Sequence, residues 1–238
     1  MFRVELILSL SLAALLLASV FVAPISISST FFRIANAQEV TTLADQDSCQ
    51  AAPFSGTWDG STCTVSGITV NSGDIVVINP GITLSNTGTI DNSGTITNSG
   101  TITSYGNINN FGTITNNFGG TITNNLGTIT NDGIITNTGT IDNTGTITNS
   151  DTITNDGTLN NLGTLSNSGT INNSGTITVS DTGTITNSGT ITNDGAITIS
   201  DSSTVTNSGT ITNPGTITGT ISGNQPIGTT TILDQSSC

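Results

Sequence analysis

The segment Gly94–Thr103 reads GTITNSGTIT, which is one six-residue unit followed by most of the next. Variants of this unit fill almost all of the chain after Gly88. The apolar residues at the centres of the units lie six positions apart, without a break, from Ile129 to Ile177. Burial on one side of a helix would need apolar residues three and four positions apart, so this period excludes an amphipathic helix. A fixed short period instead indicates a solenoid, in which each unit buries its apolar residue against neighbouring units.

Each unit predicts a short strand followed by a corner. In Thr-Ile-Thr the isoleucine points to one side of the strand and both threonines point to the other. Asn and Gly follow, and both tolerate the left-handed backbone conformations that tight turns require. The Asn lies two positions after the central Ile, as Asn98 does after Ile96, and therefore shares its inward face. We expect stacked Asn residues to form ladders that also bond the corner backbone, because buried polar groups need partners.

Irregular steps between units indicate how many units complete one coil. Three of the steps that are eight residues long instead of six are separated by fifteen and by three units. Both counts divide by three, so a three-sided coil would place all three longer steps at the same corner. We predict an all-β fold consisting of a single parallel β-solenoid (β-helix), triangular, with three six-residue units per coil and about eight coils; the sequence leaves its handedness open. The longer steps are Ile82 to Ile90, Ile177 to Ile185, and Ile197 to Val205.

The amino-terminal region predicts a secretory signal peptide over 1–37. Arg3 precedes an uncharged apolar run, and the small-residue site Ala35-Asn36-Ala37 precedes Gln38. A retained membrane anchor is the alternative, since the apolar run is nearly long enough to span a bilayer. We expect the mature chain to be secreted, and to be extracellular or held at the cell surface. The other expected boundaries are a disulfide-bearing amino-terminal cap at 38–66, the solenoid at 67–221, and a carboxyl-terminal tail or cap at 222–238.

The charge of the chain excludes nucleic acid and anionic lipid as partners. Arg3 and Arg33 are the only basic residues, so the mature chain has none. Fifteen acidic residues in total, less Glu5, leave fourteen in the mature chain. Binding to phosphate groups depends on cationic side chains, which this region lacks. The expected partners are further copies of the chain or components of the cell surface and matrix, with no membrane contact after signal cleavage.

Cysteine usage agrees with export. Cys49 and Cys63 flank Phe54 and Trp58 and predict a disulfide in the amino-terminal cap. Cys238 is the last residue of the chain and leaves an odd number of cysteines, which indicates an intermolecular bond or a free thiol. If rods join end to end, Cys238 would lie opposite the cap and could lock the junction.

The repeat resembles the parallel β-solenoids of microbial cell surfaces, because runs similar to GTITNSGTITN occur in adhesin-like and haemagglutinin-like exoproteins. The resemblance covers about 67–221 and implies a non-enzymatic structural or adhesive protein. The chain is also similar to the left-handed hexapeptide helix, in which a small residue follows an aliphatic one by four positions, as Gly100 follows Ile96. Enzymes on that scaffold depend on His, which this sequence lacks, so the resemblance does not imply their chemistry.

Two sets of residues are candidates for a site, and neither supplies a catalytic group. Asp181 and Asp201 occupy equivalent places in ITVSDTGTI and ITISDSSTV. They are either solvated corner residues or a corner that binds Ca²⁺, which prefers carboxylate oxygens; no other cofactor or metal is expected. The second set is apolar and lies at or near successive corners, where it either points outward as a contact belt or fills widened corners: Tyr105, Phe111, Phe118 and Leu126.

Twelve units read Thr-Ile-Thr without change, which suggests an alternative function. Outward threonines in regular rows would suit binding to ice or to a polysaccharide, although Thr is also a good strand former wherever a residue faces solvent. In a coil of three units the motif falls on all three faces, whereas a dedicated ice face would lie on one. The Asn-rich composition also permits a chain that stays disordered until it aggregates as cross-β, against which the strict phase of Ile argues.

Overall fold

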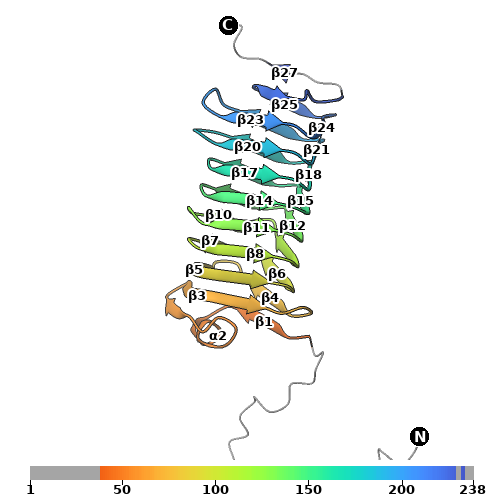
Figure 1. The fold of residues 1–238 in the computed structure, drawn as a ribbon. Coiled ribbons are helices and arrows are strands. Elements are labelled where there is room, and N and C mark those ends of the chain that lie inside the picture. The colour runs from red at the N-terminus through yellow and green to blue at the C-terminus, as the bar shows by residue number, and fades with distance from the viewer. Residues whose placement is uncertain (1–37, 229–231, 234–238) are drawn as a thin grey trace, which may run out of the picture. The chain divides into compact units, whose positions relative to one another are not determined.

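The computed structural model describes residues 38–228 and 232–233 of the 238-residue chain. The predicted signal peptide at 1–37 and the thiol of Cys238 lie outside the described residues. The described chain forms stacked turns of short strands, with the amino-terminal cap at one end and the last strands at the other (Figure 1).

The regular strands are four residues long and alternate outward and inward side chains. In β6 (Thr95–Asn98), Ile96 and Asn98 are buried, whereas Thr95 and Thr97 are half-buried on the outer surface. Thr and Ile branch at Cβ and favour the extended backbone, and the Gly of the following corner ends the strand. The outer surface of the solenoid is therefore made of the threonines of each unit and of its corners.

Hydrogen bonding joins most of the four-residue strands to the third strand that follows. β6 pairs with β9 (Thr113–Asn116) in a parallel register that places Ile96 opposite Ile114. β9 pairs in turn with β12 (Ile134–Asn137). Three strands therefore complete one turn, and the fold is an all-β parallel solenoid of about eight turns.

The pairing gives the solenoid three rows of strands, which we name faces A, B and C in the order in which the chain visits them. Face A holds β1 (Val40–Leu43), β4 (Ile75–Ile78), β6, β9, β12, β15 (Thr152–Asn155), β18 (Thr170–Asn173), β21 (Thr190–Asn193) and β24 (Thr210–Thr212). Face B begins with the first halves of β3 (Thr62–Val70) and β5 (Thr83–Asn92) and continues with β7 (Thr101–Ser104), β10 (Thr121–Asn124), β13 (Thr140–Asn143), β16 (Thr158–Asn161), β19 (Thr176–Val179), β22 (Ala196–Ile199), β25 (Thr216–Thr218) and β27 (Ile232–Leu233). Face C begins with the second halves of β3 and β5 and continues with β8 (Asn107–Asn110), β11 (Thr128–Asn131), β14 (Thr146–Asn149), β17 (Thr164–Asn167), β20 (Thr184–Asn187), β23 (Thr204–Asn207) and β26 (Ile221–Gly223).

The longer steps do not share one corner, so that prediction is wrong. Ile82 is only partly buried in the corner before β5, and the core residue of that unit is Leu84. The long step therefore runs from Val76 to Leu84, between faces A and B, because the turn closed by the Ile82 N–H and the Asn79 carbonyl inserts residues before the strand. The other two long steps, Ile177 to Ile185 and Ile197 to Val205, do lie at one corner, between faces B and C.

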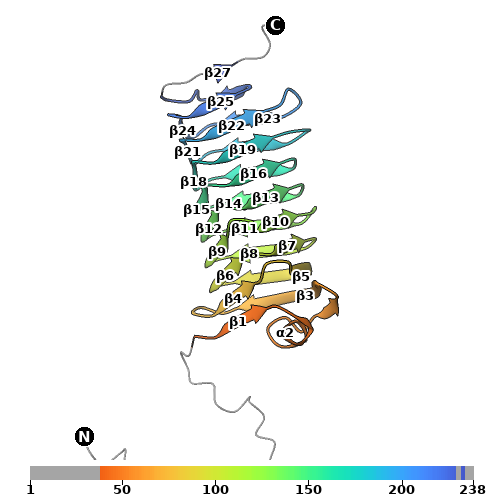
Figure 2. The same cartoon turned by 180° about the vertical axis from the view of Figure 1, so that it is seen from behind.

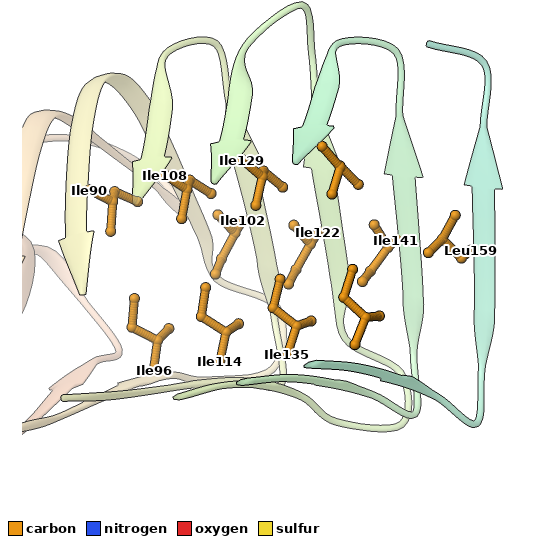
Figure 3. A pocket seen from close by; sticks show the side chains of 12 residues that line it. Ile90, Ile96, Ile102, Ile108, Ile114, Ile122, Ile129, Ile135, Ile141 and Leu159 are labelled. Atoms are coloured by element: carbon orange, nitrogen blue, oxygen red, sulfur yellow. The ribbon is translucent and has the colours of Figure 1, made fainter. Parts of the chain in front are cut away.

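The isoleucines of the three faces meet along the axis of the solenoid (Figure 3). Burial of one isoleucine side chain is worth about 2 kcal/mol, so the stack of turns supplies a thin but continuous core. The space left between these side chains is a narrow cavity of about 10 Å³, lined by eleven isoleucines and Leu159. A cavity of this size and lining holds neither a substrate nor an ordered water molecule, which would need polar partners.

Asn residues at the ends of the strands form the predicted ladders. The Nδ2 of Asn98 donates to Oδ1 of Asn116 at 2.8 Å, and the Nδ2 of Asn116 donates to Oδ1 of Asn137 at 2.7 Å. The same Asn98 amide donates to the Gly100 carbonyl in its own corner at 3.2 Å and to the Thr121 carbonyl in the next turn at 2.9 Å. Each buried Asn thus joins two turns, which confirms the role expected for this position.

Glycine at the corners allows adjacent turns to touch. A Cβ atom on Gly145 would lie 2.2 Å from the Gly127 carbonyl oxygen and 2.8 Å from the Asn124 amide nitrogen. One turn further on, a Cβ atom on Gly163 would lie 2.1 Å from the Gly145 carbonyl oxygen. A side chain at Gly145 or Gly163 would force the adjacent turns apart, because the carbonyl oxygen that it meets belongs to the backbone of the neighbouring turn and cannot move away independently.

The amino-terminal end is closed by α2 (Gln46–Gln50) and β2 (Thr57–Asp59), which pairs with β3 as an antiparallel hairpin (Figure 2). The predicted disulfide joins Cys49 of α2 to Cys63 of β3, with an S–S distance of 2.03 Å. Phe54 lies buried between these elements and extends the core beneath the first turn.

The carboxyl-terminal residues close the last turn. The Ile227 N–H donates to the Ile211 carbonyl and the Asn213 N–H donates to the Ile227 carbonyl, both at 2.8 Å. The Asn207 amide ends its ladder on the Asn224 carbonyl at 2.8 Å. Residues 224–228, which belong to the region that the sequence left as a tail or a loose cap, therefore cover the outer edge of β24.

Candidate functional surface

The four apolar corner residues point outward. Tyr105 is 54% exposed, Phe111 59%, Phe118 92% and Leu126 82%. Of the two arrangements that the sequence left open, the structure therefore shows the outward one. We call these four residues the apolar belt.

Local chain geometry brings each belt residue to the surface. Tyr105 and Phe111 occupy the first corner position after a strand, which is held by polar residues such as Thr87 and Ser93 one turn earlier. Phe118 lies in a corner that is two residues longer than usual, before Gly119 with a φ of 83°. Leu126 occupies a one-residue insertion and itself has a φ of 62°, a left-handed conformation that is costly for a bulky side chain.

The belt circles slightly more than one turn. Face C strand β8 lies between Tyr105 and Phe111, face A strand β9 between Phe111 and Phe118, and face B strand β10 between Phe118 and Leu126. Each of the three corners of the turn therefore presents one large apolar side chain. Leu126 lies at the same corner as Tyr105, one turn further along.

Ile134 adds to this surface and was missed from the sequence. It is 44% exposed and occupies the outward position of β12 that Thr113 holds in the turn before. Gly133 packs on the corner of Phe111 and Gly112, so Ile134 directly follows the belt on face A. The sequence feature that could have revealed Ile134 is a unit that reads IITN instead of TITN.

Charge is absent from the part of the solenoid that carries the belt. Residues 92–131 contain no acidic or basic side chain, and they are bounded by Asp91 and Asp132. We call 92–131 the uncharged band. On both sides of it the surface carries Asp residues with no basic residue to balance them, because 38–238 has neither Lys nor Arg.

Outward threonine pairs occur on every face. Of the twelve unchanged Thr-Ile-Thr units, five lie on face A, four on face B and three on face C. The structure therefore distributes this motif around the solenoid, as expected for three units per turn, and gives no single face dedicated to it.

Asp181 and Asp201 lie at equivalent corners of adjacent turns. Each follows, by two residues, one member of the paired residues Val179 and Ile199, and both carboxylates are exposed. Asp181 has a φ of 55°, which Asp tolerates better than most residues. Within 38–228 no group of three or more His, Cys, Asp or Glu side chains is placed to hold a metal ion.

A family model described as the haemagglutinin repeat matches three overlapping segments, 41–145, 106–169 and 146–224. Together the segments cover the solenoid from β1 to β26. The chain belongs to the haemagglutinin repeat family. Comparisons with curated proteins and with solved structures gave no match. The family agrees with the resemblance to haemagglutinin-like exoproteins that the repeat suggested.

The only helix between residues 38 and 228 is α2, which is five residues long, and none is long and apolar enough to cross a bilayer.

Proposed function

We propose that this protein is an adhesin-like structural rod that acts outside the cell or at its surface and catalyses no reaction. The match to the haemagglutinin repeat carries the proposal, because it covers the same residues as the stacked turns. The rod would hold its outward side chains at fixed spacing, and contact with other surfaces would be made through them.

The types of side chain found in the interior and on the outer surface of the solenoid support a structural role. The interior contains Ile and Asn, and the axial cavity is bordered by Ile and Leu alone. The sequence has no His, and the outward strand positions hold mainly Thr and Asn. Such side chains can make hydrogen bonds to a partner, but they offer no activated nucleophile or general base.

Export through the segment 1–37 forms part of this proposal. The disulfide between Cys49 and Cys63 supports it, because disulfides persist in oxidising compartments outside the cytosol. The alternative of a retained anchor would still place the solenoid on the outside.

Antibody labelling of intact producing cells tests the location. The chain has no Lys or Arg after Arg33, so trypsin can strip other surface proteins without cutting the solenoid. We expect labelling of intact cells that survives trypsin, and weaker attachment of a deletion strain to solid surfaces and to other cells. Labelling that appears only after permeabilisation would contradict the proposal.

End-to-end assembly into filaments or a surface layer is a finer form of the same function. It would bring β1 of one rod to the last turn of another, and Cys238 would lock the junction. It would also have to displace or extend the contacts of Ile227 that cover β24. Electron microscopy and gel filtration of wild type and Cys238→Ser, with and without reductant, test it; an unchanged size distribution would exclude the locking role.

Binding to ice or a polysaccharide through outward threonines is the second candidate function. The observation that favours it is the pairing of successive Thr residues along a face, for example Thr95 with Thr113 and Thr97 with Thr115. Thermal hysteresis and retention on insoluble glycans measure the two activities. Absence of both would remove this candidate and leave the structural role.

A further inference from the structure

Two independent features coincide in one part of the rod. The belt residues are the large apolar side chains that the corners of the described solenoid expose by more than half. All four of them lie within the 40-residue segment 92–131 that carries no charge. Large apolar side chains exposed at every corner of one turn indicate contact surfaces, and the lack of charge removes the groups that would remain hydrated there.

We propose that the uncharged band is a lateral contact between copies of this chain, in which belt residues of one rod pack against the band of a neighbouring rod.

Charge restricts the place at which a second copy of the chain can bind. Two rods cannot attract one another through ion pairs, because 38–238 carries acidic residues and no Lys, Arg or His. Side by side, they would repel wherever their Asp residues face each other. The uncharged band is the longest stretch of the described solenoid at which two rods can approach without this repulsion, and it is also where apolar side chains are available to be buried.

The positions of the belt residues favour several neighbours over one. Tyr105, Phe111 and Phe118 lie at three different corners of a turn, so a single flat partner cannot cover all of them. Each corner offers little area compared with the roughly 1,200–2,000 Å² that stable pairs of proteins bury. The contact between two rods is therefore weak, and it gains strength when a rod has neighbours at more than one corner.

The insertions that carry Phe118 and Leu126 add nothing to the core. Ile114, Ile122 and Ile129 remain buried on both sides of these insertions, just as in turns without them. Leu126 is 82% exposed in a left-handed conformation that a Gly or Asn would adopt more easily. Strain kept at an exposed residue points to a role outside the fold of the single chain.

Sedimentation velocity of the purified full chain over a concentration series tests the proposal. The belt variant combines Tyr105→Ser, Phe111→Ser, Phe118→Ser and Leu126→Asn. A matched control, Leu162→Ser, changes a half-buried apolar corner residue outside the band. A second variant keeps the belt and adds one Asp to the band on each face, at outward positions equivalent to those of Asp91 and Asp142: Thr103→Asp, Thr115→Asp and Thr130→Asp.

We expect wild type to associate as concentration rises, and to do so more strongly at 1 M than at 0.1 M salt, since the Debye length falls from about 10 Å to about 3 Å and screens the Asp residues outside the band. The belt and Asp variants should weaken association at least tenfold while their circular dichroism matches that of wild type, and Leu162→Ser should not. If the belt variant fails to fold, the Asp variant alone tests the lateral contact.

Monomeric wild type at every concentration, or association unchanged in the Asp variant, would overturn the proposal. Monomeric wild type that binds a neutral insoluble glycan through the belt would also overturn it and would identify the band as a glycan site. None of these results depends on where the protein is located. The lateral contact can therefore be wrong while the proposed surface role holds, and the reverse is also true.

Discussion

The uncharged band and the turns that follow it share one interior and differ on the outside. Ile114 and Asn116 in the band are as buried as Ile153 and Asn155 two turns later, and both strands belong to face A. At the corners, the band carries the apolar belt, whereas the later turns carry mainly Ser, Thr, Asp and Gly. The same core therefore supports two surfaces of different chemistry.

This difference separates the requirements of the fold from those of function. Inward positions and most corner glycines are in contact with the adjacent turn, so they repeat with few exceptions. Outward corner positions meet solvent and are free to vary. A change that is restricted to outward positions of one band is therefore not explained by folding, and substitutions on the two sides of a strand should have very different effects.

The largest effect is expected for Ile147→Ala in β14. Ile147 is 1% exposed on the axis, and its truncation leaves a cavity between turns that cannot collapse. We expect a loss of about 4 kcal/mol in the free energy of unfolding, measured by urea denaturation. The outward control on the same strand, Thr148→Ala, should change the free energy of unfolding by less than about 0.5 kcal/mol. Equal losses would mean that the two sides of the strand are not distinct.

Gly145→Ala should lower the free energy of unfolding by about 3 kcal/mol, because the new Cβ would lie 2.2 Å from the Gly127 carbonyl oxygen. The matched control is Gly119→Ala, in the corner that presents Phe118. An alanine Cβ there would have no atom within 4 Å, and the cost would come only from the φ of 83°. We expect about 1 kcal/mol for the control. A larger loss for Gly119→Ala would show that strain, and not contact between turns, limits the corners.

Asn137→Ala breaks the ladder of face A. It removes the acceptor of Asn116 and the donor to Asn155, each at 2.7 Å, and leaves buried polar groups without partners. We expect a loss of about 2 kcal/mol by the same urea measurement. Asn172→Ala, an outward Asn in β18, is the control and should be close to neutral. A neutral Asn137→Ala would mean that the ladders do not hold the turns together.

Leu126→Gly should raise the free energy of unfolding, whereas the three preceding substitutions should lower it. Relief of the left-handed conformation favours the variant by about 1 kcal/mol, reduced in part by the greater freedom of Gly in the unfolded chain. A higher midpoint of thermal unfolding, together with weaker association, would show that the belt residue is kept at the expense of stability. A lower midpoint would show instead that Leu126 contributes to the fold.

The smallest effect concerns the amino-terminal cap. The backbone N–H of Ser48, and then its side chain, bond the Asp45 carboxylate and lower its pKa. A lowered pKa in the folded state means that this stabilisation is present above the unfolded value and is lost as the pH falls through the folded one. The melting midpoints of wild type and Asp45→Ala should therefore converge below about pH 3.9. A constant difference down to acid pH would exclude the carboxylate as the cause.

Much of the interior could be predicted from the sequence, because the core is built from apolar residues that recur at a six-residue spacing. The spacing of Ile gave the strands, the Asn two positions later gave the ladders, and Cys49 with Cys63 gave the disulfide. The corner of the first long step could not be placed. Ile82 and Leu84 are both apolar and two residues apart, so periodicity alone could not decide which one enters the core.

The candidate surface was only partly predictable. The belt residues stood out as apolar residues at corners, but their direction depends on how each corner turns, which the sequence left open. The uncharged band is visible in the sequence as the gap between Asp91 and Asp132. That the belt circles the solenoid within this gap depends on the strand pairing, which the sequence does not show.

The lateral contact between rods can be tested by electron microscopy of material released from the native cell surface. The cells compared express wild type or the variant that combines Thr103→Asp, Thr115→Asp and Thr130→Asp. We predict rods lying side by side in wild type and isolated rods in the variant. Isolated rods in both samples would contradict the lateral contact, and the absence of rods from the surface material would contradict the proposed function itself.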